Sequence, residues 1–283
     1  MEKLTHILAV VEGIEEGQVV LEKAVALARH FDARIELLVA EPKQMRTFSE
    51  LCLERGYAEV FLSSAHRGSD ALHDVILRRV DFGRPDIVVK SPAPRHGDDA
   101  GLAAADWLLA SQCLAPILLV RHHGWADPVR IAVSLDVSDA DRERNSRALL
   151  HAAGFLALGC RGNLDLLYSE RELKDDALRM QRAVRVAQLV REFHVGCERL
   201  QMFDGEPGEK LPPLIAARQY DVVVIGTESA AHGWMKPHLA TGHELAAATA
   251  GDIVLVHAAT DAEARIAGWK ISSRSDERLD EPQ

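Results

Sequence analysis

Short, continuously apolar runs alternate with amphipathic stretches along the chain, and the series of runs occurs twice. The three matched pairs are Ile7–Val11 with Ile131–Leu135, Ile87–Val89 with Val222–Val224, and Ile117–Val120 with Ile253–Val256. Each run is rich in β-branched residues, as expected of a strand that helices cover on both faces. Because strand and helix alternate, each copy is predicted to form a five-stranded, parallel, doubly wound sheet. The sequence therefore predicts an α/β fold of two tandem domains.

The second copy is longer than the first in one place. The copies are offset by 124 residues at the first strand and by 135 or 136 at the last two matches, so about 11 residues are inserted between them. The insertion falls on a long predicted helix over residues 172–193, where the first copy has a shorter segment over 44–55. An apolar stripe runs along the long helix and is typical of a face that packs on a sheet. The stripe consists of Ala177, Met180, Val184, Ala187 and Val190.

The connector between the copies is predicted at residues 122–128, which include Gly124 and Pro128. The predicted domains are residues 1–122 and 128–259, followed by a polar tail over 260–283 that is expected to fray. We expect a pseudo-two-fold axis to relate the domains and their final strands to join them. The residues expected at this contact are Ile117, Leu119, Ile253 and Leu255. One continuous sheet, or two halves that differ, is expected to contradict the duplication.

Composition and charge narrow the classes of function. Of the 283 residues, 47% are hydrophobic and 27% charged, as in ordinary globular proteins, and the net charge is −10. An acidic surface repels nucleic acid and anionic lipid. No apolar run reaches the roughly 20 residues that a membrane span needs, and no signal peptide is visible. We therefore expect a cytoplasmic protein that binds neither nucleic acid nor membrane. The cysteines lie far apart, which predicts reduced and mostly buried thiols at Cys52, Cys113, Cys160 and Cys197.

The loops after strands one and four are the most informative, because open parallel sheets bind ligands beyond the carboxyl ends of the strands where the strand order reverses. In the second copy, strand one runs into Asp136. Its carboxylate can accept a hydrogen bond from a ribose hydroxyl or a base amino group. It can equally cap the next helix, as can Ser138 or Asp139, and both interpretations stay open.

Strand four of the second copy runs into Gly226 and Thr227. A glycine at this place lets the backbone approach a ligand. Further on, Leu239–Gly242 is predicted to open the last helix, where the Thr241–Gly242 pair would offer amide donors suited to a phosphate.

Three motifs recur in both copies in the same order. They are Ile-Leu-Ala-Val-Val-Glu and Ile-Ala-Val-Ser-Leu-Asp at strand one, Arg-Pro-Asp-Ile-Val-Val and Gln-Tyr-Asp-Val-Val-Val at strand four, and Pro-Ile-Leu-Leu-Val and Asp-Ile-Val-Leu-Val at the last strand. Over residues 5–258 the chain resembles the universal stress protein family, and its tandem architecture is similar to the E-type members of bacteria. The resemblance implies an adenine-nucleotide-hydrolase-like sheet that pairs through its last strand. It also implies ATP binding, as in many members, through a glycine motif after strand four and an acidic residue after strand one.

The family motif can be transferred to the second copy residue by residue. The acidic position falls on Asp136 and the first glycine on Gly226, but Ser229 holds the second glycine position and Ala240–Thr241 holds the third glycine and its hydroxyl partner. Ser229 and Ala240 each add a Cβ where a phosphate would contact the backbone. The cofactor-binding residues implied by the resemblance are Asp136, Gly226, Thr227, Ser229, Ala240, Thr241 and Gly242.

The first copy departs further from the motif in its loop over residues 90–99. Pro92 and Pro94 remove two amide donors, and Asp98–Asp99 would repel a phosphate. Lys90 and Arg95 carry compensating charge, although a lysine that extends from the strand end into solvent is the simpler interpretation of Lys90. The ligand site is therefore expected mainly in the second domain.

Other constellations favour ordinary structural roles. The loop histidines His232, His238 and His243 lack metal-ligand spacing, so no metal is expected. Serine–histidine pairs such as Ser63–Ser64 with His66, or Ser229 with His232, lack a nucleophile elbow. Residues 204–207 resemble a family loop that borders the ligand, but they also suit a turn before an acidic helix N-terminus.

The first functional hypothesis is a non-enzymatic stress-response protein that binds a small ligand, either ATP or another adenine nucleotide, or a less charged molecule. The second is a scaffold without a ligand that acts through protein partners or homo-oligomerisation. A third, minor hypothesis is a weak ATPase. In each case the chain is expected to form a dimer-like pair of domains within itself.

Overall fold

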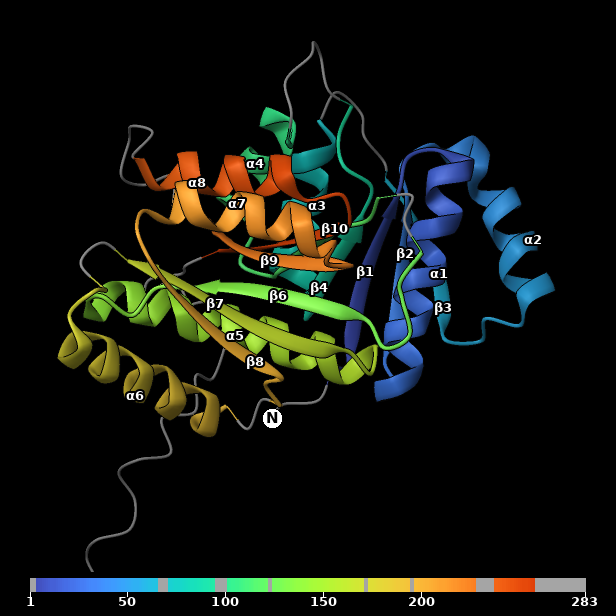
Figure 1. The fold of residues 1–283 in the computed structure, drawn as a ribbon. Helices are drawn as coiled ribbons and strands as arrows, with labels where there is room; N and C mark the ends of the chain where they lie inside the picture. Colours follow the sequence, from blue (N-terminus) through green and yellow to red (C-terminus); the bar gives the residue numbers. More distant parts are fainter. Residues whose placement is uncertain are drawn as a thin grey trace, which may run out of the picture.

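The computed structural model describes residues 4–65, 71–94, 101–121, 124–170, 173–193, 196–227 and 237–257. Strands and helices alternate in each half, as predicted (Figure 1). The first half consists of β1 His6–Val11, α1 Ile14–Phe31, β2 Arg34–Val39, η1 Pro42–Gln44, α2 Met45–Arg55, β3 Val60–Ser64, α3 Leu72–Gly83, β4 Ile87–Lys90, α4 Ala104–Ala110 and β5 Ile117–Leu119. The second half consists of β6 Arg130–Leu135, α5 Ala140–Gly159, β7 Asn163–Glu170, α6 Asp176–Glu192, β8 Arg199–Asp204, α7 Pro207–Arg218, β9 Val222–Thr227, α8 Pro237–Ala248 and β10 Asp252–His257.

All ten strands lie in one sheet, in the order β3-β2-β1-β4-β5-β10-β9-β6-β7-β8. The strand pairs within each half are parallel, whereas β5 and β10 are antiparallel. The order is therefore the same when it is read outward from β5 and from β10. The expectation that one continuous sheet would contradict a duplication is wrong, because two complete sheets have merged edge to edge without mixing their strand orders.

The contact between β5 and β10 involves the residues predicted from the sequence. Ile253 lies opposite Leu119, Val254 opposite Leu118 and Leu255 opposite Ile117. Leu118 and Val254 form the central pair, and each half contributes this central residue and the residue on either side of it. This symmetric register is what a pseudo-two-fold axis between the halves would produce.

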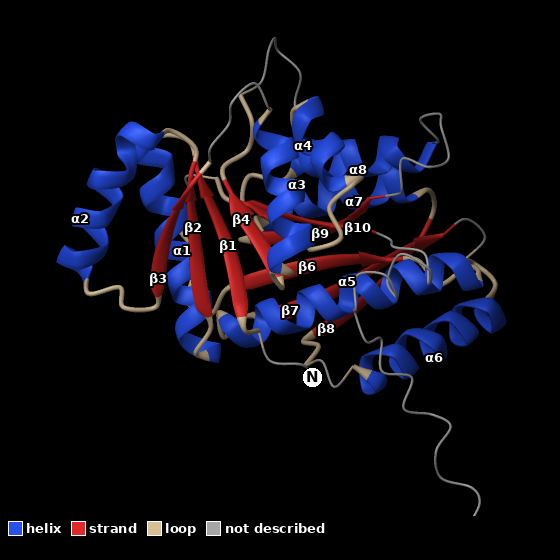
Figure 2. Ribbon diagram, turned by 180° about the vertical axis from the view of Figure 1, so that it is seen from behind, coloured by secondary structure: helices blue, strands red, loops and turns tan. Residues whose placement is uncertain are grey.

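Helices cover both faces of the sheet and bury an apolar core on each. Figures 1 and 2 show α3, α4, α7 and α8 gathered on one face, with α1, α2, α5 and α6 on the other. Side chains alternate between the two cores along each strand, as the pleat requires. In β1, Ile7, Ala9 and Val11 face the α1 side and Leu8 and Val10 face the α3 side. This double burial explains why the strands are continuously apolar.

The aspartate before the fourth strand of each half fixes the start of the first strand. Asp86 Oδ2 accepts hydrogen bonds from the backbone amides of Thr5 (2.6 Å) and His6 (2.9 Å). In the second half, Asp221 Oδ2 accepts from the amide of Arg130 (2.8 Å). The recurrent Asp-Ile/Val-Val-Val motif thus has a structural reason, since its carboxylate binds amides that the sheet leaves unpaired.

A buried charge cluster links the two halves beside the β5–β10 contact. Lys23 of α1 forms an ion pair with Asp252 at the start of β10, and the Asp252 side chain is fully buried. Asp252 also accepts hydrogen bonds from Trp125 Nε1 (2.7 Å) and the Arg121 amide (2.8 Å). Burial lowers the pKa of Lys23 and raises the pKa of Asp252, and the opposite charge of the partner counteracts each shift.

Helix α6 forms where the insertion was predicted, but its apolar stripe does not face the sheet. Met180 is 66% exposed and Val184 is 47% exposed, whereas Val186 and Leu189 are buried. The helix is rotated because Arg182 reaches inward to Glu170, with which it forms a hydrogen-bonded ion pair. The periodicity predicted the helix correctly and its buried face wrongly.

The cysteines match the sequence prediction. All four are free thiols, with Cys52 and Cys113 buried and Cys160 and Cys197 partly buried. Burial raises the pKa of Cys113 and of Cys160 to about 12, so both thiols stay protonated and unreactive at neutral pH.

Replacing Asp221 tests the role of the motif aspartate. Asp221→Ala removes a buried acceptor from the Arg130 amide and is expected to lower the free energy of unfolding by about 3 kcal/mol. Asp221→Asn keeps one oxygen and should lose roughly half as much. Urea denaturation measures both, with the exposed Glu50→Ala as the control. Equal stability of all three variants would show that the carboxylate does not hold β6.

Replacing Asp252 tests the charge cluster between the halves. Asp252→Ala leaves the buried Lys23 ammonium without its partner and is expected to cost about 3–5 kcal/mol at neutral pH. Because burial lowers the pKa of Lys23 in the folded state, the folded variant releases its proton more readily than the unfolded chain does. Stability relative to wild type should therefore be lowest near pH 7 and recover as the pH rises toward about 10.

Urea denaturation at several pH values follows this recovery, with the neighbouring exposed Glu22→Ala as the control. A deficit that stays constant between neutral and alkaline pH contradicts an unpaired Lys23 charge as its cause.

Candidate functional site

The point where the strand order reverses in the second half lies between β6 and β9. The chain leaves β6 toward β7 on one side, while β9 lies on the other. Ile131 pairs with Val222 and Val133 with Val224. The printed pairing ends at Val133 and Val224, and both strands run on toward the same edge of the sheet. Asp136 directly follows β6 and Gly226 lies near the end of β9, so the two residues that the sequence nominated separately stand at the carboxyl ends of neighbouring parallel strands.

The Asp136 carboxylate is bound by groups of its own loop. Oδ1 accepts hydrogen bonds from the Ser138 amide (2.9 Å) and hydroxyl (2.6 Å), and Oδ2 accepts from Arg142 Nη1 (2.7 Å). The Asp136 side chain nevertheless keeps 36% of its surface exposed, and Arg142 keeps 41%. A ligand can reach this carboxylate, but it would share the oxygens with Ser138 and Arg142.

The choice of helix cap, which the sequence left open, falls on Asp139. Its Oδ1 accepts a hydrogen bond from the Arg142 amide (2.9 Å) at the start of α5. Asp136 therefore does not cap the helix. The backbone amide of Asp136 instead donates to Ser146 Oγ (2.8 Å), and that hydroxyl donates back to the Asp136 carbonyl (2.7 Å).

A second polar group lies at the carboxyl end of β7, next to Asp136. Arg182 of α6 binds both oxygens of Glu170 (3.1 and 3.2 Å) and donates to the Val137 carbonyl (3.1 Å). Tyr168 donates its hydroxyl to Glu170. Burial raises the pKa of Tyr168, and the Glu170 carboxylate and the nearby Asp136 raise it further, so the phenol stays protonated as a donor.

The glycines and the threonine of the predicted nucleotide motif have different environments. Gly226 is exposed, and a Cβ at this position would meet only the Leu149 side chain, at 3.6 Å. Thr227 is buried, with its hydroxyl near the carbonyls of Ala110 (3.2 Å) and Val256 (3.3 Å). Gly226 is thus open to a ligand, whereas Thr227 serves the packing between the halves.

The last helix begins earlier than predicted. Helix α8 starts at Pro237, so the Thr241–Gly242 pair lies inside it and not at its N-terminus. A Cβ on Gly242 would lie 3.3 Å from Trp107 Cη2, so this glycine makes room for an indole of the first half. Ser229 lies outside the described residues, as do the side chains of Ala240 and Thr241.

In the first half the corresponding loop is closed by a buried ion pair. Lys90 Nζ lies 2.9 Å from Asp106 Oδ1, and the two side chains are 4% and 1% exposed. Asp106 Oδ2 accepts a hydrogen bond from the Ala93 amide (2.8 Å). The expectation that Lys90 extends into solvent is wrong, because a carboxylate sixteen residues later meets it inside the protein.

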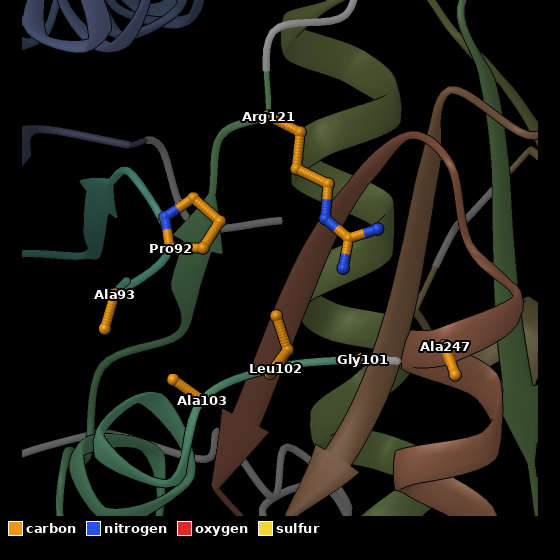
Figure 3. Close-up of a pocket in the computed structure, with 7 residues that line it drawn as sticks. All are labelled: Pro92, Ala93, Gly101, Leu102, Ala103, Arg121 and Ala247. Carbon is orange, nitrogen blue, oxygen red and sulfur yellow. The ribbon is translucent and has the colours of Figure 1, made fainter. Parts of the chain in front are cut away.

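A pocket of about 390 Å³ lies between the halves beside this loop. Figure 3 shows side chains of both halves around it. The residues that line it are Pro92, Ala93, Gly101, Leu102, Ala103 and Arg121 of the first half and Ala247 of the second. Arg121 donates hydrogen bonds to the carbonyls of Thr249 and Ala246 at the end of α8, so its guanidinium ties the wall of the pocket to the second half.

The remaining candidate features have structural environments where they are described. Ser63 donates to the buried Glu36 (2.7 Å), and its proposed partner His66 lies outside the described residues. The His243 ring contacts Trp107 in a tilted arrangement with centroids 4.4 Å apart, while His232 and the side chain of His238 lie outside the described residues. Gly205 and Glu206 connect the end of β8 to Pro207, the first residue of α7, as in the structural interpretation. Over the described ranges, no group of three His, Cys, Asp or Glu side chains could hold a metal ion.

Sequence reasoning missed Arg142, Arg182, Glu170 and Tyr168 as members of the site. The inserted helix carries four arginines off its apolar stripe, and this excess was the available signal. The ion pair between Lys90 and Asp106 was also missed, because the partners lie sixteen residues apart and a lone lysine at a strand end suggests an exposed side chain. Across the described part of the chain, no helix has both the length and the apolar character needed to cross a bilayer.

Comparison with known proteins is consistent with this architecture. No family model matches the chain. The universal stress protein E homolog of Haemophilus influenzae is 24% identical in an alignment 177 residues long, and the match covers 54% of this chain. The match spans 56% of the length of that relative.

Solved structures match the whole fold. A protein of Pseudomonas aeruginosa assigned to the universal stress proteins has a TM-score of 0.76 at 18% identity, covering 94% of this chain and 97% of that one. A universal stress protein from Archaeoglobus fulgidus reaches 0.66 at 13% identity, covering 90% and 98%. The cytoplasmic domain of a prokaryotic cation chloride cotransporter reaches 0.60 at 14% identity, covering 90% and 96%. The chain thus has the fold of the universal stress proteins over both of its halves, and the resemblance to that family predicted from its sequence is confirmed.

Proposed function

We propose that the chain is a tandem, E-type universal stress protein that binds a small ligand, and that the ligand site lies in the second half between β6 and β9. The observation that carries this proposal is that the accessible Asp136 carboxylate follows β6 and the exposed Gly226 lies near the end of β9, the two strands on either side of the point where the strand order reverses. Open α/β sheets bind their ligands at such points. Because the relative from Haemophilus influenzae is a universal stress protein, we propose that the chain acts in the stress response.

The charges around the site favour a ligand of modest charge. Arg142 and Arg182 are positive, but each is paired with a carboxylate, Asp136 or Glu170. The site therefore offers little net positive charge to a triphosphate. It suits an adenine nucleoside or monophosphate, whose ribose hydroxyls or base amino group can donate to Asp136 and whose body can lie on Gly226. We expect affinity to fall in the order AMP, ADP, ATP.

A scaffold without a ligand is the second candidate. It is favoured by one observation, namely that both oxygens of Asp136 already have partners in Ser138 and Arg142. In this case the polar network would only hold the loop before α5, and the protein would act through its surfaces.

Calorimetric titration with adenosine, AMP, ADP and ATP separates the two candidates. We expect Asp136→Ala to weaken the binding of the best ligand about 10-fold or more, because a hydrogen bond to a charged acceptor is lost. The matched control is Glu12→Ala, which removes the exposed carboxylate at the equivalent place in the first half and should leave the affinity unchanged.

Thermal unfolding checks that both variants remain folded. Absence of heat and of thermal shift with every nucleotide leaves the scaffold as the function. A loss of affinity that is equal in Asp136→Ala and Glu12→Ala rejects the location of the site in the second half.

A further inference from the structure

The fourth strands of the two halves, β4 and β9, carry different side chains at equivalent positions near their ends. Ile7 pairs with Ile87 in the first half, and Ile131 pairs with Val222 in the second. Three residues after Ile87 and Val222 come Lys90 and Ile225. A buried cation in one half thus corresponds to an apolar side chain in the other.

The partner of Lys90 also has an equivalent in the second half. Asp106 stands twelve residues before Leu118, and Gly242 stands twelve residues before Val254, the central pair of the β5–β10 contact. The rings of the next residues, Trp107 and His243, lie in contact with their centroids 4.4 Å apart, as expected of equivalent positions near a two-fold axis. Where the first half has lysine and aspartate, the second has isoleucine and glycine, with Ile225 Cγ2 3.6 Å from the place of a Gly242 Cβ.

The surroundings of the Asp106 carboxylate are those of an anion site. An ammonium donates to Oδ1 (2.9 Å) and the Ala93 amide donates to Oδ2 (2.8 Å). Lys90 also donates to the Ser91 carbonyl, so it is fixed between the strand and the loop. Converging cationic and amide donors of this kind bind carboxylate and phosphate oxygens. Here the chain supplies the anion itself.

We propose that Asp106 is a built-in substitute for a ligand anion, which closes the loop after β4 in the first half and confines anionic ligands to the second half. The confinement rests on the function proposed above, whereas the internal anion site rests only on the contacts of Lys90, Ala93 and Asp106. Pro92 and Ala93 line the pocket between the halves, so the Asp106 carboxylate also fixes one wall of that pocket.

Removing the carboxylate should leave an empty site for a small anion. Asp106→Gly gives the first half the glycine of the second and leaves Lys90 buried without a partner. We expect its Tm to fall by roughly 10 °C in sodium chloride. Sodium acetate, which has the shape of the lost side chain, should raise the Tm in proportion to the logarithm of its concentration at constant ionic strength. Inorganic phosphate tests a larger anion in the same way.

The matched control is the double variant Lys90→Ile with Asp106→Gly, which copies the pair found in the second half. It carries the same glycine, so the cost of glycine in α4 is common to both variants. We expect its Tm to lie near that of wild type and to respond to acetate no more than wild type does.

An acetate response in Asp106→Gly that the double variant lacks supports the internal anion site, whether or not wild type binds nucleotide in its second half. The two proposals therefore fail separately. No response, or an equal response in both variants, overturns the internal site. If Asp106→Gly does not fold in chloride, its refolding in acetate gives the same answer, and failure of both variants to fold under all conditions also overturns it.

Discussion

The antiparallel pairing of β5 and β10 is the constraint on which the rest of the structure depends. The paired segments Ile117–Leu119 and Ile253–Leu255 are wholly apolar, and sliding one past the other would expose the faces that α4 and α8 cover. The pairing brings Trp107 against Gly242 and directs Arg121 toward the end of α8. It also sets Lys23 of one half beside Asp252 of the other. The pocket, the charge cluster and the equivalence of positions all follow from it.

Equivalent positions in the two halves carry side chains of different chemical type that serve the same contact between helices. Four residues after the cap of the first helix, the first half has Gly17, whose open side is filled by the Phe48 ring of α2. The second half has Glu143 there, paired with Arg185 of α6 and with Arg147. The inserted residues extend the helix that supplies this arginine. The second helix of each half thus contacts the first through an apolar side chain, Phe48, in the first half and through an ion pair, Arg185 with Glu143, in the second.

The sequence was sufficient for the fold and insufficient for the site, for a physical reason. Strand order follows from apolar runs such as Ile87–Val89, because burial on both faces leaves a local signal. The face that α6 buries depends on where Arg182 finds Glu170, a contact between distant residues that no period encodes. Lys90 and Asp106 are likewise distant partners, and each alone suggests an exposed side chain. Gly242 was expected to offer an amide at the start of the last helix, yet it lies inside α8 and makes room for Trp107.

The shared fold does not decide the ligand, because the same architecture occurs in the cytoplasmic domain of a cotransporter. Ligand binding depends on a few residues at the strand ends. When two copies are joined in one chain, these residues can differ between the copies. In a symmetric dimer of identical subunits, an aspartate at the position of Asp106 would appear in both halves and close both loops. A single chain can close one loop with Lys90 and Asp106 while Ile225 and Gly242 leave the other without an internal anion. Duplication within one polypeptide thus allows one half to carry its own internal anion while the other keeps an accessible carboxylate after β6 and an exposed glycine in β9.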